Sequence, residues 1–111
     1  MKQGEGTLEP AKVVELASLV DYAEGAVVSR TLVKQPAGTV TLFSFDRGQA
    51  LSEHTAPFDA LVLVLEGEAE ITIGGEPFKL KAGEAILMPA GVAHAVSASS
   101  RFKMLLVMVR S

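Results

Sequence analysis

Short apolar runs of four to eight residues, bounded by Gly, Pro, Asp or other polar residues, recur along most of this sequence. Many of the runs are rich in β-branched residues, and turn-forming residues separate them, which is the pattern of an all-β domain. The pattern predicts strands at residues 27–34, 39–45, 50–54, 60–65, 69–73, 78–80, 85–88, 93–96 and 102–109.

Two glycine-containing turns lie between predicted strands. Gly67 follows Glu66 in one of them, and Gly74 with Gly75 forms the other. Glycine adopts positive φ at little cost, so we expect both segments to be hairpin turns.

Several predicted strands are apolar on both alternating faces. This holds for residues 61–65, 85–88 and 104–109, whereas residues 68–73 alternate between polar and apolar. A strand of the first kind needs cover on both sides, by the interior of a barrel on one face and by a second sheet or a second subunit on the other. We therefore expect a homodimer. The glutamates at 66, 68 and 70 are interpreted as a solvated face.

The first 24 residues form a polar lead-in, and residues 25–111 carry the strand pattern, so we expect one domain spanning residues 1–111. Within the lead-in, residues 13–20 have apolar side chains at helical spacing after Pro10. The segment fits a short helix, and it fits a strand followed by a turn equally well.

Composition excludes several classes of function. The 111 residues include no Cys, which rules out cysteine ligands and nucleophiles. The net charge is -3 and the basic residues are scattered, so we expect neither nucleic acid nor a membrane among the partners. The polar N-terminus does not resemble a signal peptide, and we expect a cytoplasmic protein.

Histidines and glycines in residues 48–98 carry a family resemblance. Gly48, His54 and Gly67 have the spacing of one motif, and a second motif is matched by Gly83, Pro89, Gly91 and His94. In these motifs the sequence resembles the cupin superfamily, whose members are small antiparallel β-barrels of jelly-roll type. The resemblance implies the same fold here.

In metal-binding cupins two histidines and a glutamate of the first motif, with the histidine of the second, usually hold one divalent ion. Here His54 and His94 remain, while Ala56 and Ala60 occupy the other two positions. The resemblance therefore implies a weak two-histidine site for one transition-metal ion (Zn, Fe, Mn or Ni) or a barrel without metal. Asp59 is the candidate third ligand if the chain bulges at residues 56–58.

The two alanines also leave space on the face that the resemblance turns inward. Beside them we expect an apolar pocket for a small molecule, lined by Ala56, Ala60, Val62, Phe43, Phe45, Met88 and Met104. The alternative is that these residues form ordinary core. The sequence thus predicts a barrel that binds a small molecule through a metal ion. The alternative is a metal-free, non-catalytic ligand-binding or sensor module. The sequence assigns neither a reaction nor catalytic residues.

Overall fold

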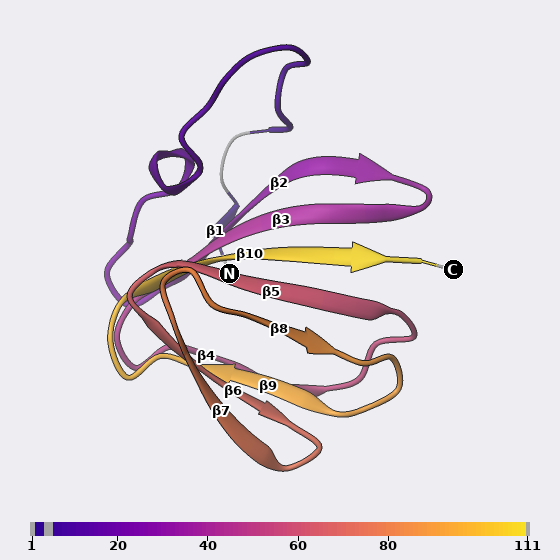
Figure 1. Ribbon diagram of the computed structural model, residues 1–111. Helices are drawn as coiled ribbons and strands as arrows, with labels where there is room; N and C mark the ends of the chain where they lie inside the picture. The colour runs from indigo at the N-terminus through magenta and orange to yellow at the C-terminus, as the bar shows by residue number, and fades with distance from the viewer. Residues whose placement is uncertain (1, 4–5, 111) are drawn as a thin grey trace.

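The computed structural model describes residues 2–3 and 6–110, which form two facing sheets (Figure 1). One sheet has six strands in the order β1-β2-β3-β10-β5-β8, and the other has four in the order β4-β9-β6-β7. The strands are β1 (Lys2–Gln3), β2 (Val27–Gln35), β3 (Gly38–Phe45), β4 (Ala50–His54), β5 (Asp59–Glu66), β6 (Glu68–Ile73), β7 (Glu76–Lys81), β8 (Ala85–Met88), β9 (His94–Ser97) and β10 (Phe102–Val109).

The predicted all-β jelly-roll fold is confirmed. All nine predicted strands are present, with boundaries within two residues of those expected. Strands β2 to β10 pair only in antiparallel fashion, and the short β1, which the sequence did not predict, pairs in parallel with β2. The described residues contain no helix long and apolar enough to cross a membrane.

Between the two sheets lies the main hydrophobic core. Along β5, Ala60, Val62 and Val64 are buried, and the residues between them are more exposed, as expected for a strand with one face toward the core. The rings of Phe45, at the end of β3, and Phe102, at the start of β10, stack with their centroids 4.5 Å apart, and both side chains are fully buried. Aromatic rings bury large apolar areas, so this pair helps to hold the two strands together.

The two glycine turns differ from each other. Gly74 and Gly75 both have positive φ and close the β6–β7 hairpin, as predicted. The hairpin prediction for Gly67 was wrong, because this residue connects β5 of the six-strand sheet to β6 of the four-strand sheet. Gly67 has φ +77, and a Cβ there would overlap the carbonyl oxygen of Arg101. The chain therefore makes a sharp corner between sheets that a side chain would obstruct.

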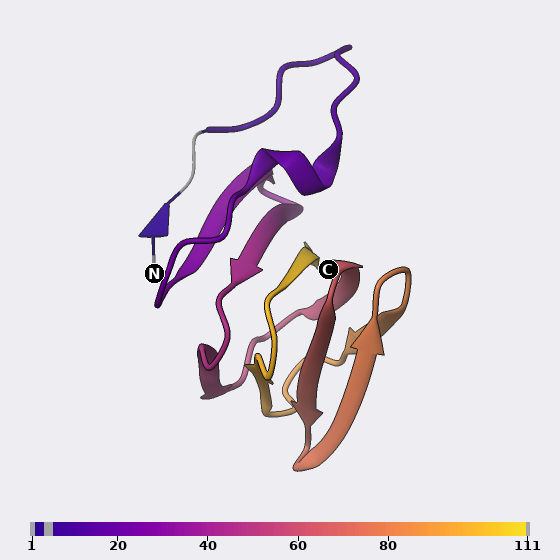
Figure 2. The same ribbon diagram turned by 90° about the vertical axis from the view of Figure 1, so that its left-hand side faces the viewer.

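Residues 6–24, which we call the strap, loop out and return across the outer side of the six-strand sheet (Figures 1 and 2). Of the two alternatives for residues 13–20, the short helix is the one present, as a 3-10 helix, η1 (Leu16–Leu19), and these residues contain no strand. Val20 of the strap packs with Leu32 and Leu42 in a second, smaller core.

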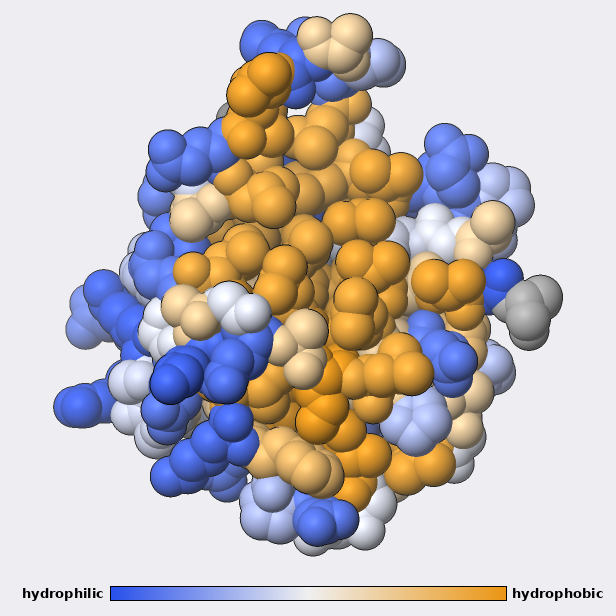
Figure 3. All heavy atoms as spheres, in the orientation of Figure 1, coloured by the Kyte–Doolittle hydropathy of each residue, from blue (hydrophilic) through white to orange (hydrophobic). Residues whose placement is uncertain are grey.

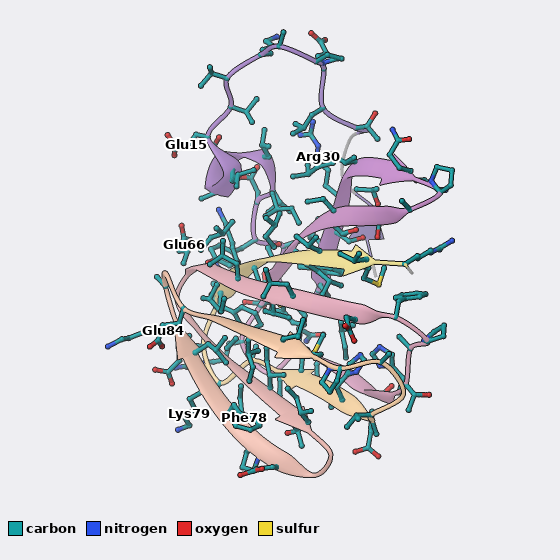
Figure 4. The ribbon with its side chains drawn as sticks, turned by 45° about the vertical axis from the view of Figure 1, so that its right-hand side comes forward. Glu15, Arg30, Glu66, Phe78, Lys79 and Glu84 are labelled. Carbon is teal, nitrogen blue, oxygen red and sulfur yellow. The ribbon has the colours of Figure 1, made fainter. Side chains whose placement is uncertain are left out.

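Polar side chains of the sheet bind the backbone of the strap. Arg30 lies beneath the loop of the strap (Figure 4), and its Nε donates to the carbonyl of Gly6 at 2.9 Å. The buried Ser44 hydroxyl donates to the carbonyl of Asp21 at 2.8 Å, and the buried Lys103 ammonium donates to that of Ala17 at 2.6 Å. These bonds satisfy groups that would otherwise be buried without a partner.

Candidate functional site

The two histidines of the chain lie directly opposite each other on adjacent strands. His54 ends β4, His94 begins β9, and the two are register partners. Farther along the same strands Leu51 pairs with Val96, so β4 has one residue more than β9 between these two pairs. This β-bulge decides the site, because without it Glu53 rather than His54 would face His94.

The imidazole rings meet through their Nε2 atoms, which are 3.1 Å apart, with an angle of 70° between the ring planes. On the other side of each ring, Nδ1 contacts a backbone carbonyl: that of Ser52 at 2.8 Å for His54 and that of Val92 at 3.3 Å for His94. A carbonyl oxygen only accepts, so an Nδ1 that carries the hydrogen can donate to it, and the Nε2 of that ring then directs a lone pair toward the other ring.

With the hydrogen on both Nδ1 atoms, two Nε2 lone pairs would face each other, and a cation shared by the two rings would stabilise them. Nitrogens that bind one ion at about 2.0–2.1 Å, with roughly 90–110° between the bonds, lie about 2.8–3.4 Å apart. The 3.1 Å separation falls within that interval. The Nδ1 contacts are also the outer contacts that fix the orientation of metal-binding histidines. The two residues present therefore fit a divalent ion.

The two histidines differ in their exposure to solvent. His94 is 5% exposed, while His54 is exposed. An ion bound by both rings would thus keep positions open for water or for donor atoms of a small molecule.

Asp59 does not join the two histidines. Within residues 2–3 and 6–110, no three His, Asp or Glu side chains form a group that could hold a metal ion. The reason is strand alternation: the next residue, Ala60, is buried in the core, so Asp59 begins β5 on its outward side. Its Oδ1 accepts a hydrogen bond of 2.9 Å from the backbone N–H of Ala90.

That hydrogen bond ties Asp59 to the loop that leads into His94. In the same loop Gly91 N–H donates to the carbonyl of Ala56 at 2.9 Å, which joins the loop after His54 to the loop before His94. The carbonyl of Val92, one residue farther along, holds the His94 ring. Asp59 thus supports the site from outside it, a role that the spacing of residues in the sequence did not indicate.

The residues predicted to line a pocket mostly belong to the core. Phe43, Phe45, Ala60, Val62, Met88 and Met104 are buried and pack in one hydrophobic cluster, and Ala56 is half-buried. None of the seven lines any of four surface hollows formed by described residues. The alternative of ordinary core therefore describes these six side chains.

A second polar cluster lies away from the histidines. Asp46, the first residue after β3, accepts hydrogen bonds of 2.7 Å from Gly25 N–H and from Arg101 Nε. The Gly25 hydrogen bond and then Arg101 lower the pKa of Asp46 from 3.8 to about 2. Partial burial is the main cause that raises the pKa of Tyr22, and the hydrogen bond that the Tyr22 hydroxyl donates to Glu66 raises it further. The Tyr22 contact joins the strap to the barrel, and the Asp46 contacts join the segments before β2 and β10 to the end of β3. The sequence analysis did not single them out.

The fold and the matched motifs define a small cupin, and comparison with known proteins agrees. The model of the cupin domain family matches residues 41–110, which is more than half of the chain. The protein belongs to this family.

Solved structures of similar proteins have the same fold. A conserved protein of unknown function from Streptococcus pyogenes, SPY1581, is 41% identical, with 100% of this chain and 96% of that chain covered and a TM-score of 0.89. A cupin superfamily protein from Desulfitobacterium hafniense is 34% identical, with 94% and 95% covered and a TM-score of 0.87. An uncharacterized protein of Streptomyces coelicolor is 36% identical over 56 residues, which span 50% of this chain and 53% of the relative.

Proposed function

We propose that the protein binds a divalent transition-metal ion through Nε2 of His54 and Nε2 of His94, and that this ion helps to hold a small molecule beside the exposed His54. The observation that carries the proposal is the 3.1 Å contact between the two Nε2 atoms, with both Nδ1 atoms engaged by backbone carbonyls. Imidazole ligands suit Zn, Fe and Ni, and Mn accepts the oxygen donors of water or a ligand.

Two protein ligands leave most of the coordination shell to other molecules. A small molecule with two oxygen donors, such as a hydroxy acid or a dicarbonyl compound, would complete the shell better than one with a single donor. Once the first donor is bound, the second binds without a further loss of translational entropy. When bound, the ion would supply Lewis acidity to such a ligand. The chain's own contribution is to orient the two rings and to shield one side of the pair from water.

A specific observation supports a second candidate, a metal-free binding or sensor module. A separation of 3.1 Å also matches an N–H···N hydrogen bond, so one proton shared by the two rings could replace the ion. The pair would then carry one positive charge and would favour an anionic ligand such as a carboxylate. The lack of a third protein ligand among the described residues supports this alternative.

Metal analysis of protein purified without a histidine tag tests the first proposal. We expect about one transition-metal ion per chain after incubation with Zn, Ni, Fe(II) or Mn and removal of excess metal, measured by plasma mass spectrometry. His54→Ala and His94→Ala should each remove the ion. Ser52→Ala is the matched control on β4, because it keeps the backbone carbonyl that holds His54 and should keep the metal.

Wild-type protein that takes up no metal under any of these conditions would contradict metal binding. Native mass spectrometry then tests the second candidate, which predicts an organic acid bound to the wild type and absent from both histidine variants. Unchanged metal content in both variants would place the ion elsewhere and would overturn the assignment to the histidine pair.

A further inference from the structure

Two basic side chains of the barrel have no acidic partner. Lys34 lies near the end of β2, and Arg110 directly follows β10. In the part of the chain that the structure describes, neither forms an ion pair or a side-chain hydrogen bond, whereas Lys12, Arg101 and Lys103 contact carboxylates. Both side chains are exposed. Acidic residues outnumber basic ones in this sequence, so two basic side chains without acidic partners are available to bind an anion.

Strand pairing brings these two side chains to the same side of the six-strand sheet. Lys34 is the register partner of Thr39 on β3, and Thr39 is in turn the partner of Met108 on β10. The side chains of paired residues lie on one side of a sheet, and so do those of residues two apart on a strand. Arg110 follows Met108 by two residues and shares its side. The Arg110 backbone N–H donates to the carbonyl of Ala37 at 2.8 Å, which ties the end of β10 to the β2–β3 turn.

Both basic residues line one hollow of about 430 Å³, at the end of the sheet where the β2–β3 turn and the end of β10 lie together (Figure 1). Gln35, Pro36 and Thr39 complete the described lining, and none of these residues is acidic. On the face drawn in Figure 3, hydrophobic side chains cover the middle, and hydrophilic ones gather at the edge that holds this turn. The volume of the hollow is that of a site for a small molecule.

The side chains around the hollow are hydrogen-bond donors. The Arg110 guanidinium presents its N–H groups in a fixed plane, and its Cζ lies 5.3 Å from the centre of the Phe58 ring, a contact that helps to hold it in place. The Lys34 ammonium and the Gln35 amide add further donors. The Thr39 hydroxyl is buried and has no hydrogen-bond partner among the described residues, an unfavourable state. A turn of this side chain toward the hollow would let the hydroxyl bond to a ligand.

We propose that this hollow binds the phosphate group of a small phosphate monoester, with Arg110 and Lys34 as its charged contacts. A phosphate monoester carries a charge of about −2 at neutral pH and has three terminal oxygen atoms, so it balances two cations and accepts several hydrogen bonds at once. A carboxylate has a single charge and would leave one of the cations unpaired. The organic part of the ester would lie against Pro36, in the volume that the phosphate leaves free.

Titration of the full chain, followed by the NMR signals of its backbone amides, tests the proposal. The protein is first treated with a chelating resin, so that no ion at the histidines can hold the phosphate. Glycerol phosphate is the probe, and we expect the signals of Lys34, Gln35, Thr39 and Arg110 to shift with a Kd of about 1 mM. Inorganic phosphate should bind more weakly, because it lacks the organic part. Acetate should bind at least about tenfold more weakly, because it pairs with one cation only.

Arg110→Gln and, separately, Lys34→Gln should each weaken the binding of glycerol phosphate by at least about tenfold, because each removes a charge-assisted contact. Both side chains are exposed, and the substitution at 110 keeps the backbone N–H that donates to Ala37, so both variants should keep the fold. Lys79→Gln is the matched control. Lys79 is also exposed and lies on β7, directed away from the barrel in Figure 4. Loss of this distant charge should change the affinity by less than about twofold.

Two results would overturn the proposal: amide signals that do not move at about 20 mM glycerol phosphate, or an affinity that is unchanged in both Arg110→Gln and Lys34→Gln. Inorganic phosphate or acetate that binds as tightly as glycerol phosphate would overturn the choice of a phosphate monoester. His54→Ala should bind glycerol phosphate as the wild type does, because this hollow and the histidine pair share no residue. Failure of the metal site would therefore leave this proposal standing, and the reverse also holds.

Discussion

At the scale of single residues, Asp59 shows how a carboxylate can serve a site without touching it. Its hydrogen bond to Ala90 restrains the loop whose Val92 carbonyl holds the His94 ring. Loss of such an outer contact typically weakens metal binding by about 10–100-fold, because the first ligand is no longer held in one orientation. Asp59 is therefore a positioning residue for the proposed metal site.

Asp59→Ala should lower zinc affinity by about tenfold, and Asp59→Asn should restore most of it, since the amide oxygen still accepts from Ala90 N–H. Competition titration with a chromogenic chelator measures both affinities. Glu68→Ala, on the solvated face of β6, is the control for a lost negative charge. Equal loss in the Ala and Asn variants would mean that the charge acts and the hydrogen bond does not. Unchanged affinity in Asp59→Ala would rule out the positioning role.

At the scale of elements, the corner at Gly67 holds the two sheets together. Gly67→Ala should destabilise the fold by about 2 kcal/mol or more, because a side chain adds strain at positive φ and overlaps Arg101 and Phe102. Gly75→Asn in the β6–β7 hairpin is the matched control. Its φ is also positive, nothing lies within 4 Å of an added Cβ, and Asn tolerates this conformation. Urea unfolding of both variants measures the difference, and equal stabilities would contradict the argument.

The Asp46 carboxylate links three elements and should make them sensitive to acid. Its folded pKa is about 2, below the ordinary 3.8, so its contribution to stability is complete above about pH 4 and is lost as the pH falls toward 2. Asp46→Asn should be less stable than the wild type at pH 5, and the difference should shrink as the pH approaches 2. Urea unfolding at several pH values tests this. A difference that stays constant from pH 5 to pH 2 would contradict it.

The strands could be predicted from the sequence because their signal is local. Apolar runs bounded by turn residues mark β5 and β10, and polar–apolar alternation marks β6, without knowledge of any partner. Which sheet a strand joins depends on pairing with residues distant in the sequence. For this reason the sequence around Gly67 resembled a hairpin although the chain there passes from one sheet to the other. The histidine pair was found through its motif positions, but the bulge that puts His54 opposite His94 depends on pairing between β4 and β9. The contact of Asp59 with Ala90, 31 residues away, is equally non-local.

At the scale of the whole molecule, the histidine pair joins two strands that are distant in the sequence. The histidines lie on β4 and β9 of the four-strand sheet, 40 residues apart along the chain. The unfolded chain does not hold the two rings together, so an ion bound by both would favour the folded state. Metal binding should therefore stabilise the whole fold.

This coupling predicts a specific thermal behaviour. The wild-type Tm should rise on addition of zinc, and the rise should grow with the concentration of free zinc, because only the folded chain holds the two rings together. His94→Ala should show no such rise, whereas Glu68→Ala, on the solvated face of β6, should show the same rise as the wild type. Scanning calorimetry with and without zinc measures these shifts. An equal zinc shift in the wild type and in His94→Ala would contradict binding of the ion by the histidine pair.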